Sequence, residues 1–229
     1  MRVHAEKIKK EFIRKGKGSN VFAAVETCSP VLEAGTLTVV TGRSGSGKST
    51  LLNMLAGILA PTEGTVYYDD KDLYAMGDEE LSRFRNAHIG FIPQGKSAIS
   101  SLTVLENVCL PDLLYGEPDE KKALLLMERF GIADLAQVMP DELSGGEQRR
   151  MAIARALMKN PGVLFADEPT GDLDDENTEL VFKALKETAA DGCAVLMVTH
   201  EADAVKYADR CFRMDGGVLT EMFSELKCE

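Results

Sequence analysis

The feature that most constrains the fold of this 229-residue chain is a glycine-rich segment between two apolar ones. Residues 42–50 have the sequence GRSGSGKST, which matches in full the pattern GxxxxGK followed by Ser or Thr. The β-branched run Thr36–Thr41 precedes it, and the apolar residues of Lys48–Ala56 predict a largely buried helix after it. A strand, a tight glycine loop and a helix in this order form an anion site, because backbone N–H groups point inward and the helix N-terminus adds its dipole.

This loop predicts a binding site for a nucleoside triphosphate and Mg²⁺. Lys48 can place a compact positive charge on the β- and γ-phosphates, and the Ser49 hydroxyl can bind Mg²⁺. The alternative is a glycine-rich turn with an incidental lysine, which the flanking strand and helix disfavour. The predicted phosphate-binding residues are Gly42, Arg43, Ser44, Gly45, Ser46, Gly47, Lys48, Ser49 and Thr50.

Two further apolar runs, Val163–Ala166 and Ala194–Val198, predict strands that are buried on both faces. A helical pattern over Asn177–Ala190 separates them. Because buried strands that alternate with helices form parallel sheets with crossover connections, we expect an α/β core. The segment Val21–Glu33 has an irregular β-like pattern.

The middle third of the chain differs from this core. Its patterns predict helices over Leu102–Leu110, Asp119–Phe130 and Ala133–Val138. We therefore interpret residues 95–145 as a helical insertion into the α/β core. The alternative is that these helices are ordinary crossovers of the sheet.

Two acids, Asp167 and Glu168, directly follow the run Val163–Ala166. The carboxyl ends of parallel strands are where open α/β sheets bind ligands. Asp167 is then expected near the Mg²⁺ ion, and Glu168 can orient or deprotonate the water that attacks the γ-phosphate. Taken alone, such a pair would more commonly cap a helix.

Composition excludes several classes of function. With 26 Lys and Arg against 37 Asp and Glu, the net charge is −11, which disfavours general binding to nucleic acid or anionic lipid.

The N-terminus lacks the apolar segment of a signal peptide, so we expect a soluble, cytoplasmic protein. The five cysteines form no CxxC pair, which fits a reducing compartment: Cys28, Cys109, Cys193, Cys211 and Cys228.

A second helix N-terminus suited to an anion lies further along. Residues 143–150 have the sequence LSGGEQRR, in which Ser144, Gly145 and Gly146 open a helix predicted over Glu147–Lys159. Here the chain resembles the ATP-binding-cassette ATPases, whose signature is LSGGQ or a close variant. In that family two subunits pair head-to-tail, and the signature of one covers the ATP held by the other. The resemblance implies a second copy of this chain as a partner.

Other motifs extend the resemblance over nearly the whole chain. Gln94 matches the family's Q-loop, which touches Mg²⁺ and reports to the membrane subunit, and Gly171–Asp174 matches the D-loop between the two sites. His200 matches the switch histidine that contacts the γ-phosphate, although a lone histidine would otherwise be structural. Phe12 falls where the family usually stacks an aromatic ring on adenine, with a buried apolar side chain as the alternative.

The resemblance assigns roles to these residues. It implies that Lys48, Glu168 and His200 are catalytic. It also implies a Mg²⁺ site at Ser49, Gln94 and Asp167. Further nucleotide contacts, some of them made across the dimer, would come from Phe12, Ser144, Gly145, Gly146 and Asp174.

The implied fold is a P-loop NTPase (RecA-like) core with a mostly parallel sheet, an N-terminal antiparallel β region and an inserted α-helical subdomain. Residues 1–94 and 146–229 would form the ATP-binding core of one domain, and about 95–145 the helical subdomain. The sequences IGFIPQ, LTVLENV and ADEPTGDLD resemble the subgroup of macrolide exporters, lipoprotein-releasing systems, peptide-antibiotic detoxification systems and the cell-division pair. These ATPases work with a separate membrane permease, on the cytoplasmic face of the membrane. Pro93 and Gly95-Lys96 depart from the subgroup beside the coupling loop, which leaves the permease type open.

Besides a transporter motor, three other classes of cassette ATPase exist. A cassette for DNA repair needs a long coiled-coil insertion, but Thr50 and Leu143 are too close for one, and the acidic charge also disfavours it. A translation-factor cassette carries two cassettes in one chain, whereas this chain has one. A non-transporting ATPase of the cell-division type stays open.

Overall fold

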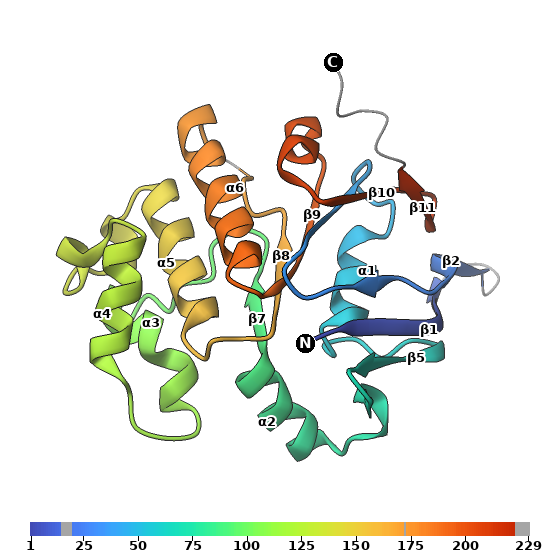
Figure 1. Cartoon of the computed structure of the whole chain (residues 1–229), viewed down its shortest axis with the longest axis horizontal. Coiled ribbons are helices and arrows are strands. Elements are labelled where there is room, and N and C mark those ends of the chain that lie inside the picture. The colour runs from blue at the N-terminus through green and yellow to red at the C-terminus, as the bar shows by residue number, and fades with distance from the viewer. Residues whose placement is uncertain (15–19, 172, 223–229) are drawn as a thin grey trace.

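The computed structural model describes residues 1–14, 20–171 and 173–222, and Figure 1 shows their arrangement. A six-stranded sheet has the order β11-β10-β4-β9-β8-β7 within these ranges. Its strands are β4 (Leu37–Thr41), β7 (Ile89–Ile92), β8 (Val163–Asp167), β9 (Ala194–Thr199), β10 (Arg210–Asp215) and β11 (Val218–Met222). All neighbours pair in parallel except β10 and β11.

The two central strands are buried along their whole length. Every residue of β8 and of β9 is buried, as the continuous apolar runs predict. Alternate side chains point to opposite faces, so Val195 and Met197 pack into one hydrophobic cluster while Leu196 and Val198 pack into the other. Because both faces of such a strand pack against a hydrophobic core, every position must be apolar, which explains the unbroken apolar run.

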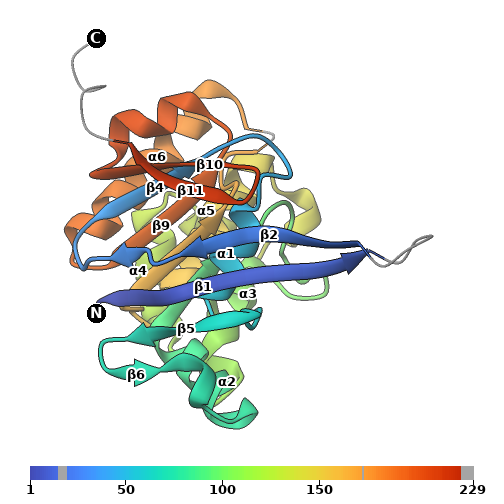
Figure 2. The same ribbon diagram turned by 90° about the vertical axis from the view of Figure 1, so that its right-hand side faces the viewer.

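A second, antiparallel sheet covers one face together with helix α1 (Lys48–Leu55). Its strands are β1 (Val3–Arg14), β2 (Asn20–Cys28), β3 (Val31–Leu32), β5 (Glu63–Tyr68) and β6 (Lys71–Asp72). Figure 2 shows β2, β1, β5 and β6 side by side. Leu51 and Leu52 of α1 share a buried cluster with Ile8 of β1 and Phe165 of β8. The helix that follows the glycine loop is therefore fixed between the two sheets.

Helices cover the other face of the large sheet (Figure 1). They are α3 (Val104–Leu113), α4 (Glu120–Arg129), α5 (Gly145–Leu157) and α6 (Asp175–Ala190), with single 3₁₀ turns η2 (Ala133–Leu135) and η3 (Pro140–Glu142). Helix α5 begins two residues before its predicted start, because Ser144 and Glu147 form a capping box. The segment Ala133–Val138, predicted as a helix, is only a 3₁₀ turn at its start. Helix α3 runs on through Pro111 to Leu113, beyond the predicted end at Leu110.

The expected α/β core, with its mostly parallel sheet, N-terminal antiparallel region and helical region, is confirmed. The sequence patterns gave no prediction for β5, β10, β11 or α2 (Asp78–His88), nor for the 3₁₀ turns η1 (Leu73–Ala75) and η4 (Ala202–Tyr207). These elements mix polar and apolar residues and are in part exposed, so no unbroken apolar run marks them in the sequence. None of the helices in the described ranges is long and apolar enough to cross a bilayer.

Candidate functional site

The glycine-rich loop connects β4 to α1, and at two of its glycines the backbone leaves no space for a side chain. Gly47 caps α1 with a φ of 107°, and a Cβ atom there would lie 2.1 Å from the carbonyl oxygen of Ala24 in β2. A Cβ at Gly42 would lie 2.2 Å from the carbonyl oxygen of Met214 in β10. The glycines are required because other strands pack directly against the loop.

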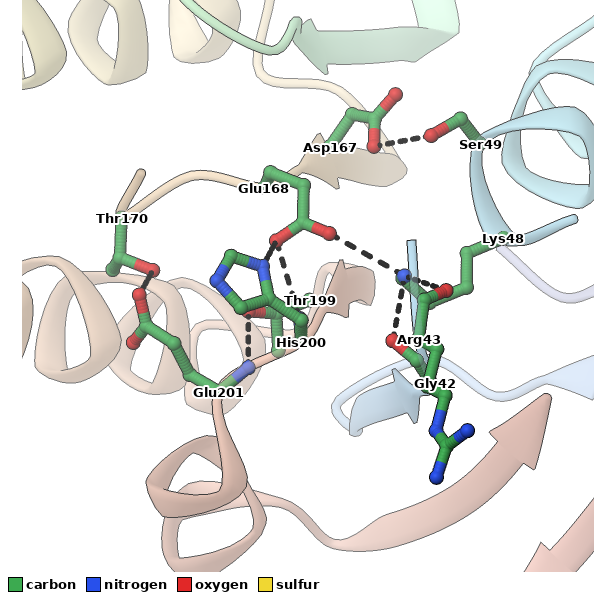
Figure 3. A network of polar contacts seen from close by, with 10 residues as sticks. All are labelled: Gly42, Arg43, Lys48, Ser49, Asp167, Glu168, Thr170, Thr199, His200 and Glu201. Atoms are coloured by element: carbon green, nitrogen blue, oxygen red, sulfur yellow. Dashed lines mark hydrogen bonds and ion pairs between the residues drawn. The ribbon is translucent and has the colours of Figure 1, made fainter. Parts of the chain in front are cut away.

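Lys48 lies at the start of α1 and is 5% exposed. Its Nζ atom donates hydrogen bonds to the carbonyl oxygens of Gly42, at 2.8 Å, and of Arg43, at 3.2 Å. The same atom is 3.4 Å from Oε1 of Glu168, and Figure 3 shows these contacts converging from the loop and from the end of β8. A buried ammonium group is thus held at the mouth of the loop by oxygen atoms.

Ser49 and Asp167 meet across the site although they are far apart in the sequence. The Ser49 hydroxyl donates to Oδ1 of Asp167 at 2.9 Å (Figure 3). Burial raises the pKa of the Asp167 carboxyl, an effect that the Ser49 hydrogen bond and the nearby Lys48 oppose. A positive charge placed beside these two oxygen atoms would relieve the cost of keeping this carboxylate ionised.

The donor set fits Mg²⁺. Hydroxyl and carboxylate oxygen atoms are the hard ligands that this ion prefers, usually completed by phosphate and water. Gln94, a third predicted ligand, follows β7 and lines the same cavity as Ser49. Ser46 in the loop also has a buried hydroxyl oxygen with no hydrogen-bond partner among the described residues, as expected of a group whose partner is a bound anion.

Glu168 and His200 form a pair where β8 and β9 end. Oε2 of Glu168 lies 2.8 Å from Nδ1 of His200 and accepts a hydrogen bond from its backbone N–H at 3.2 Å. Glu168 has a φ of 45°, an uncommon backbone conformation for a residue other than glycine. Its own N–H donates to the carbonyl of Val198 in the neighbouring strand at 2.9 Å. The strained residue is therefore fixed through both its backbone and its side chain.

A further hydrogen bond joins the segments that follow Glu168 and His200. The buried Thr170 hydroxyl donates to Oε1 of Glu201 at 2.7 Å, and the Glu201 N–H donates to the Thr199 hydroxyl at 3.1 Å (Figure 3). Sequence analysis missed Thr170 and Glu201. Their proximity depends on the pairing of β8 with β9, and no local pattern encodes it.

A cavity of about 440 Å³ lies over the loop and is lined by residues from distant parts of the chain. Phe12 of β1 lies on its wall, 36% exposed, together with Phe22 of β2. The two residues are paired directly across the strands, with ring centroids 6.0 Å apart. Phe22 was not predicted; the β-like pattern after the turn signal at residues 15–20 is the sequence feature that could have found it.

The structure brings together most of the predicted residues, but not all of them. Phe12, Ser44, Gly45, Gly47, Lys48, Ser49, Thr50, Gln94 and Glu168 line the cavity, and Asp167 and His200 contact that set. Ser144, Gly145, Gly146 and Asp174 do not line it. Ser144 instead caps α5 and Asp174 caps α6. Asp172, within the motif at 171–174, lies outside the described residues.

Known proteins that are similar to this chain identify its family. The family model described as ABC transporter matches residues 25–171. An uncharacterized ABC transporter ATP-binding protein of Methanocaldococcus jannaschii, MJ1508, is 41% identical over 92% of this chain and 95% of its own. A lipoprotein-releasing system ATP-binding protein of Chlorobium chlorochromatii, LolD 2, is 36% identical over 95% of this chain and 93% of its own.

Among solved structures, the chain is similar to the cassette MJ0796 in a dimeric, post-hydrolysis state bound to ADP and Pi. The TM-score is 0.87 at 34% identity, and the match covers 96% of this chain and 97% of that one. At this coverage the similarity extends over nearly the whole chain.

Proposed function

This chain belongs to the ABC transporter family as an ATP-binding subunit that hydrolyses ATP to ADP and phosphate, and we propose that the residues around the 440 Å³ cavity carry out that reaction. The observation that carries the assignment is the meeting of Lys48, Ser49, Asp167 and Glu168 at one point. The Lys48 ammonium, the Ser49 hydroxyl and two carboxylates, from the loop and from the end of β8, converge where the phosphates would lie.

At the phosphate end, the loop residues Gly42–Thr50 and the Lys48 ammonium bind the triphosphate. Lys48 exchanges its carbonyl partners for phosphate oxygen atoms, which are stronger acceptors because they carry charge. Phe12 stacks on the base. Residues that bind both ends of the nucleotide fix the γ-phosphate in place, which is what phosphoryl transfer chiefly requires.

Ser49, Asp167 and Gln94 would hold Mg²⁺. When bound, the ion neutralises charge on the phosphate oxygen atoms. The Ser49–Asp167 hydrogen bond of 2.9 Å supports this assignment, because it shows two oxygen ligands already within reach of each other.

Glu168 orients the attacking water and accepts its proton, and His200 contacts the γ-phosphate. The 2.8 Å contact between them supports a shared task, since a proton accepted by the carboxylate lies next to the imidazole. Lys48 Nζ lies 3.4 Å from the other carboxylate oxygen of Glu168.

The site is completed by a second copy of this chain. Ser144, Gly145 and Gly146 do not line the cavity of their own chain, but they present a helix N-terminus that favours an anion. We therefore assign them to the ATP of the partner in a head-to-tail dimer, with Asp174 at the interface. ATP then joins the two copies, and hydrolysis releases them.

Dimerisation driven by ATP would power a separate membrane permease, on which this subunit sits at the cytoplasmic face. Residues 1–94 and 146–229 supply the nucleotide-binding core, and residues of about 95–145 form the helical subdomain. The relative named as part of a lipoprotein-releasing system supports a transport role of this kind.

The substitution Lys48→Ala tests the assignment. We expect the rate of ATP hydrolysis to fall by about 10²-fold or more, since placed charges in such sites contribute several kcal/mol to the transition state. Lys183→Ala is the matched control, because Lys183 is an exposed lysine of α6 that forms an ion pair with Glu179 on the same helix, at 2.8 Å. Near-normal turnover in Lys48→Ala would refute the assignment of the loop.

A further inference from the structure

A second cavity, of about 690 Å³, borders the glycine-rich loop and shares no lining residue with the nucleotide cavity. Its walls come from the end of β4 and the start of the loop, from η4 and His200 before it, and from β10 and β11. Sites for small molecules typically have volumes of about 300–1,000 Å³, with mostly apolar walls and a few polar groups. The second cavity is therefore a separate candidate site for a small molecule.

Arg43 contributes its backbone to the nucleotide site and its side chain to this second cavity. Its carbonyl oxygen accepts a hydrogen bond from Lys48 at 3.2 Å. Figure 3 shows its guanidinium group pointing away from Lys48 and Glu168, and it lines the second cavity. Within the described ranges, Arg43 is exposed and its guanidinium group has no ion pair or hydrogen bond. The guanidinium group is thus available to a ligand other than the nucleotide.

A second guanidinium group without a partner lines the same cavity. Arg213 of β10 pairs in register with Thr41 of β4, two residues before Arg43, so the two arginines lie on neighbouring segments. Arg213 is also exposed, and none of the residues that the structure describes forms an ion pair with it. Two unpaired like charges in one cavity repel each other, and a bound anion would relieve that repulsion.

The other charged groups of the cavity do not neutralise the two arginines. The carboxylate of Asp203 forms an ion pair with Lys206 at 2.6 Å. Asp215 lines the cavity too, but it forms no ion pair with any described residue. Nδ1 of His200 is already in contact with Glu168 at 2.8 Å. The cavity therefore has more cationic side chains than carboxylates, in a chain whose net charge is −11.

The remaining walls are apolar. They are formed by side chains of η4, β10 and β11, namely Ala202, Val205, Met214 and Met222. Methionine is flexible and polarizable, so it adapts to apolar ligands of irregular shape. A guanidinium group binds carboxylate or phosphate oxygen atoms through a planar fork of N–H donors. The combination of walls fits a ligand with an apolar body and an anionic group.

We propose that the second cavity binds an organic anion with an apolar body, and that Arg43 and Arg213 hold its anionic group. The apolar body packs against Val205, Met214 and Met222. This inference goes beyond the proposed function and does not depend on it, because the two cavities share no lining residue.

The position of the second cavity makes its ligand an effector of ATP hydrolysis. The Arg43 carbonyl accepts a hydrogen bond from Lys48, and His200, on the cavity wall, contacts Glu168. An anion that draws Arg43 or His200 toward itself therefore changes the surroundings of both Lys48 and Glu168. Coupling between two sites through shared residues of this kind is reciprocal in binding free energy.

Anilinonaphthalene sulfonate is a suitable probe, because it joins a sulfonate to aromatic rings and fluoresces on apolar protein surfaces. With saturating ADP and Mg²⁺, we expect one molecule to bind per chain, at least about tenfold more tightly than phenylnaphthylamine, which has the rings without the charge. Inorganic sulfate should displace the probe only weakly. Equal affinity for the charged and uncharged probes would overturn the proposal, as would displacement of the probe in proportion to the concentration of ADP.

The substitution Arg213→Gln locates the bound probe. We expect about tenfold weaker binding, because one of the two charges that hold the sulfonate is lost, and a rate of ATP hydrolysis within about twofold when no probe is present. Arg210→Gln is the matched control: Arg210 lies on the same strand but donates to Glu221 at 2.7 Å and to the Val31 carbonyl at 2.9 Å. Its affinity for the probe should be unchanged. Equal weakening in both variants, or none in Arg213→Gln, would overturn the proposal.

A variant of the apolar wall gives an independent test. Met222→Glu places a carboxylate at the end of β11, where it repels the sulfonate, and should also weaken binding about tenfold or more. Unchanged affinity in this variant would overturn the proposed position of the ligand. In the unsubstituted chain, saturating probe should change the rate of ATP hydrolysis about threefold or more, and the same concentration should have little effect on Arg213→Gln. An equal response in both chains would overturn the effector role.

Discussion

The substitution Glu168→Gln separates the chemistry of this subunit from its folding and its binding of ATP. Glutamine keeps the size of the side chain and one oxygen acceptor, but it cannot take a proton from water. The carboxylate accepts one hydrogen bond from the His200 N–H, contacts the His200 ring at 2.8 Å, and lies 3.4 Å from Lys48 Nζ. The substitution therefore removes a charge while leaving the local packing nearly unchanged.

Two magnitudes follow from these contacts. Hydrogen bonds to a charged group contribute about 1.5–3 kcal/mol and neutral ones about 0.5–1.5 kcal/mol, so the loss of charge should cost about 1 kcal/mol of stability. The like charge of Asp167 next to Glu168 is relieved at the same time, which offsets part of that cost. Loss of a general base slows a reaction by about 10²–10⁴-fold, which corresponds to a barrier higher by about 3–5 kcal/mol.

The assay compares three properties of the purified variant. We expect hydrolysis of ATP to fall by at least about 10²-fold while the midpoint of thermal unfolding shifts by only about 2–4 °C. Because ATP that is not hydrolysed keeps joining two copies, light scattering after size exclusion should detect a dimer with ATP and a monomer with ADP.

A second substitution tests the composite site. Adding Ser144→Arg places bulk and charge at the N-terminus of α5, where the partner's γ-phosphate would lie. The double variant should bind ATP as a monomer and form no dimer. Equal dimerisation with ADP, or a dimer that survives Ser144→Arg, would contradict the composite site.

Three further substitutions probe single residues. His200→Ala should slow hydrolysis about tenfold or more and leave affinity for ATP and ADP within about threefold, and a collapse of both affinities would identify a structural histidine instead. Asp167→Asn should raise the midpoint of unfolding at pH 7, because burial raises the pKa of this carboxyl and its ionised form therefore destabilises the fold. This gain in stability should shrink as the pH falls through the raised pKa of the folded state toward the unfolded value of about 3.9. Calorimetry across that pH range measures the change. Phe12→Ala should weaken fluorescence-detected binding of ATP about tenfold, since stacking of a base contributes about 1–3 kcal/mol, and binding of inorganic triphosphate should not change.

The sequence by itself determined the parts of this protein that depend on neighbouring residues. The loop at 42–50 needs glycine, lysine and serine at fixed spacing, because the anion site is built from consecutive backbone groups. The apolar runs Val163–Ala166 and Ala194–Val198 predicted two buried strands, each of which extends one residue further in the structure, and α5 was predicted from the segment that begins it. The resemblance carried by residues 143–150 then gave the family, which the comparisons bear out.

Tertiary structure alone decided which side chains meet. Ser49 reaches Asp167 across 118 positions of the chain, and Glu168 meets His200 only because β8 and β9 pair in parallel in one register. The pairing of Phe12 with Phe22 follows from the register of a hairpin, and the hold of Arg149 on Pro93 from the way α5 packs against the end of β7. Periodicity in a sequence reports which residues one element buries, but strand order, register and helix packing are set by the free energy of the whole core, which no single segment encodes.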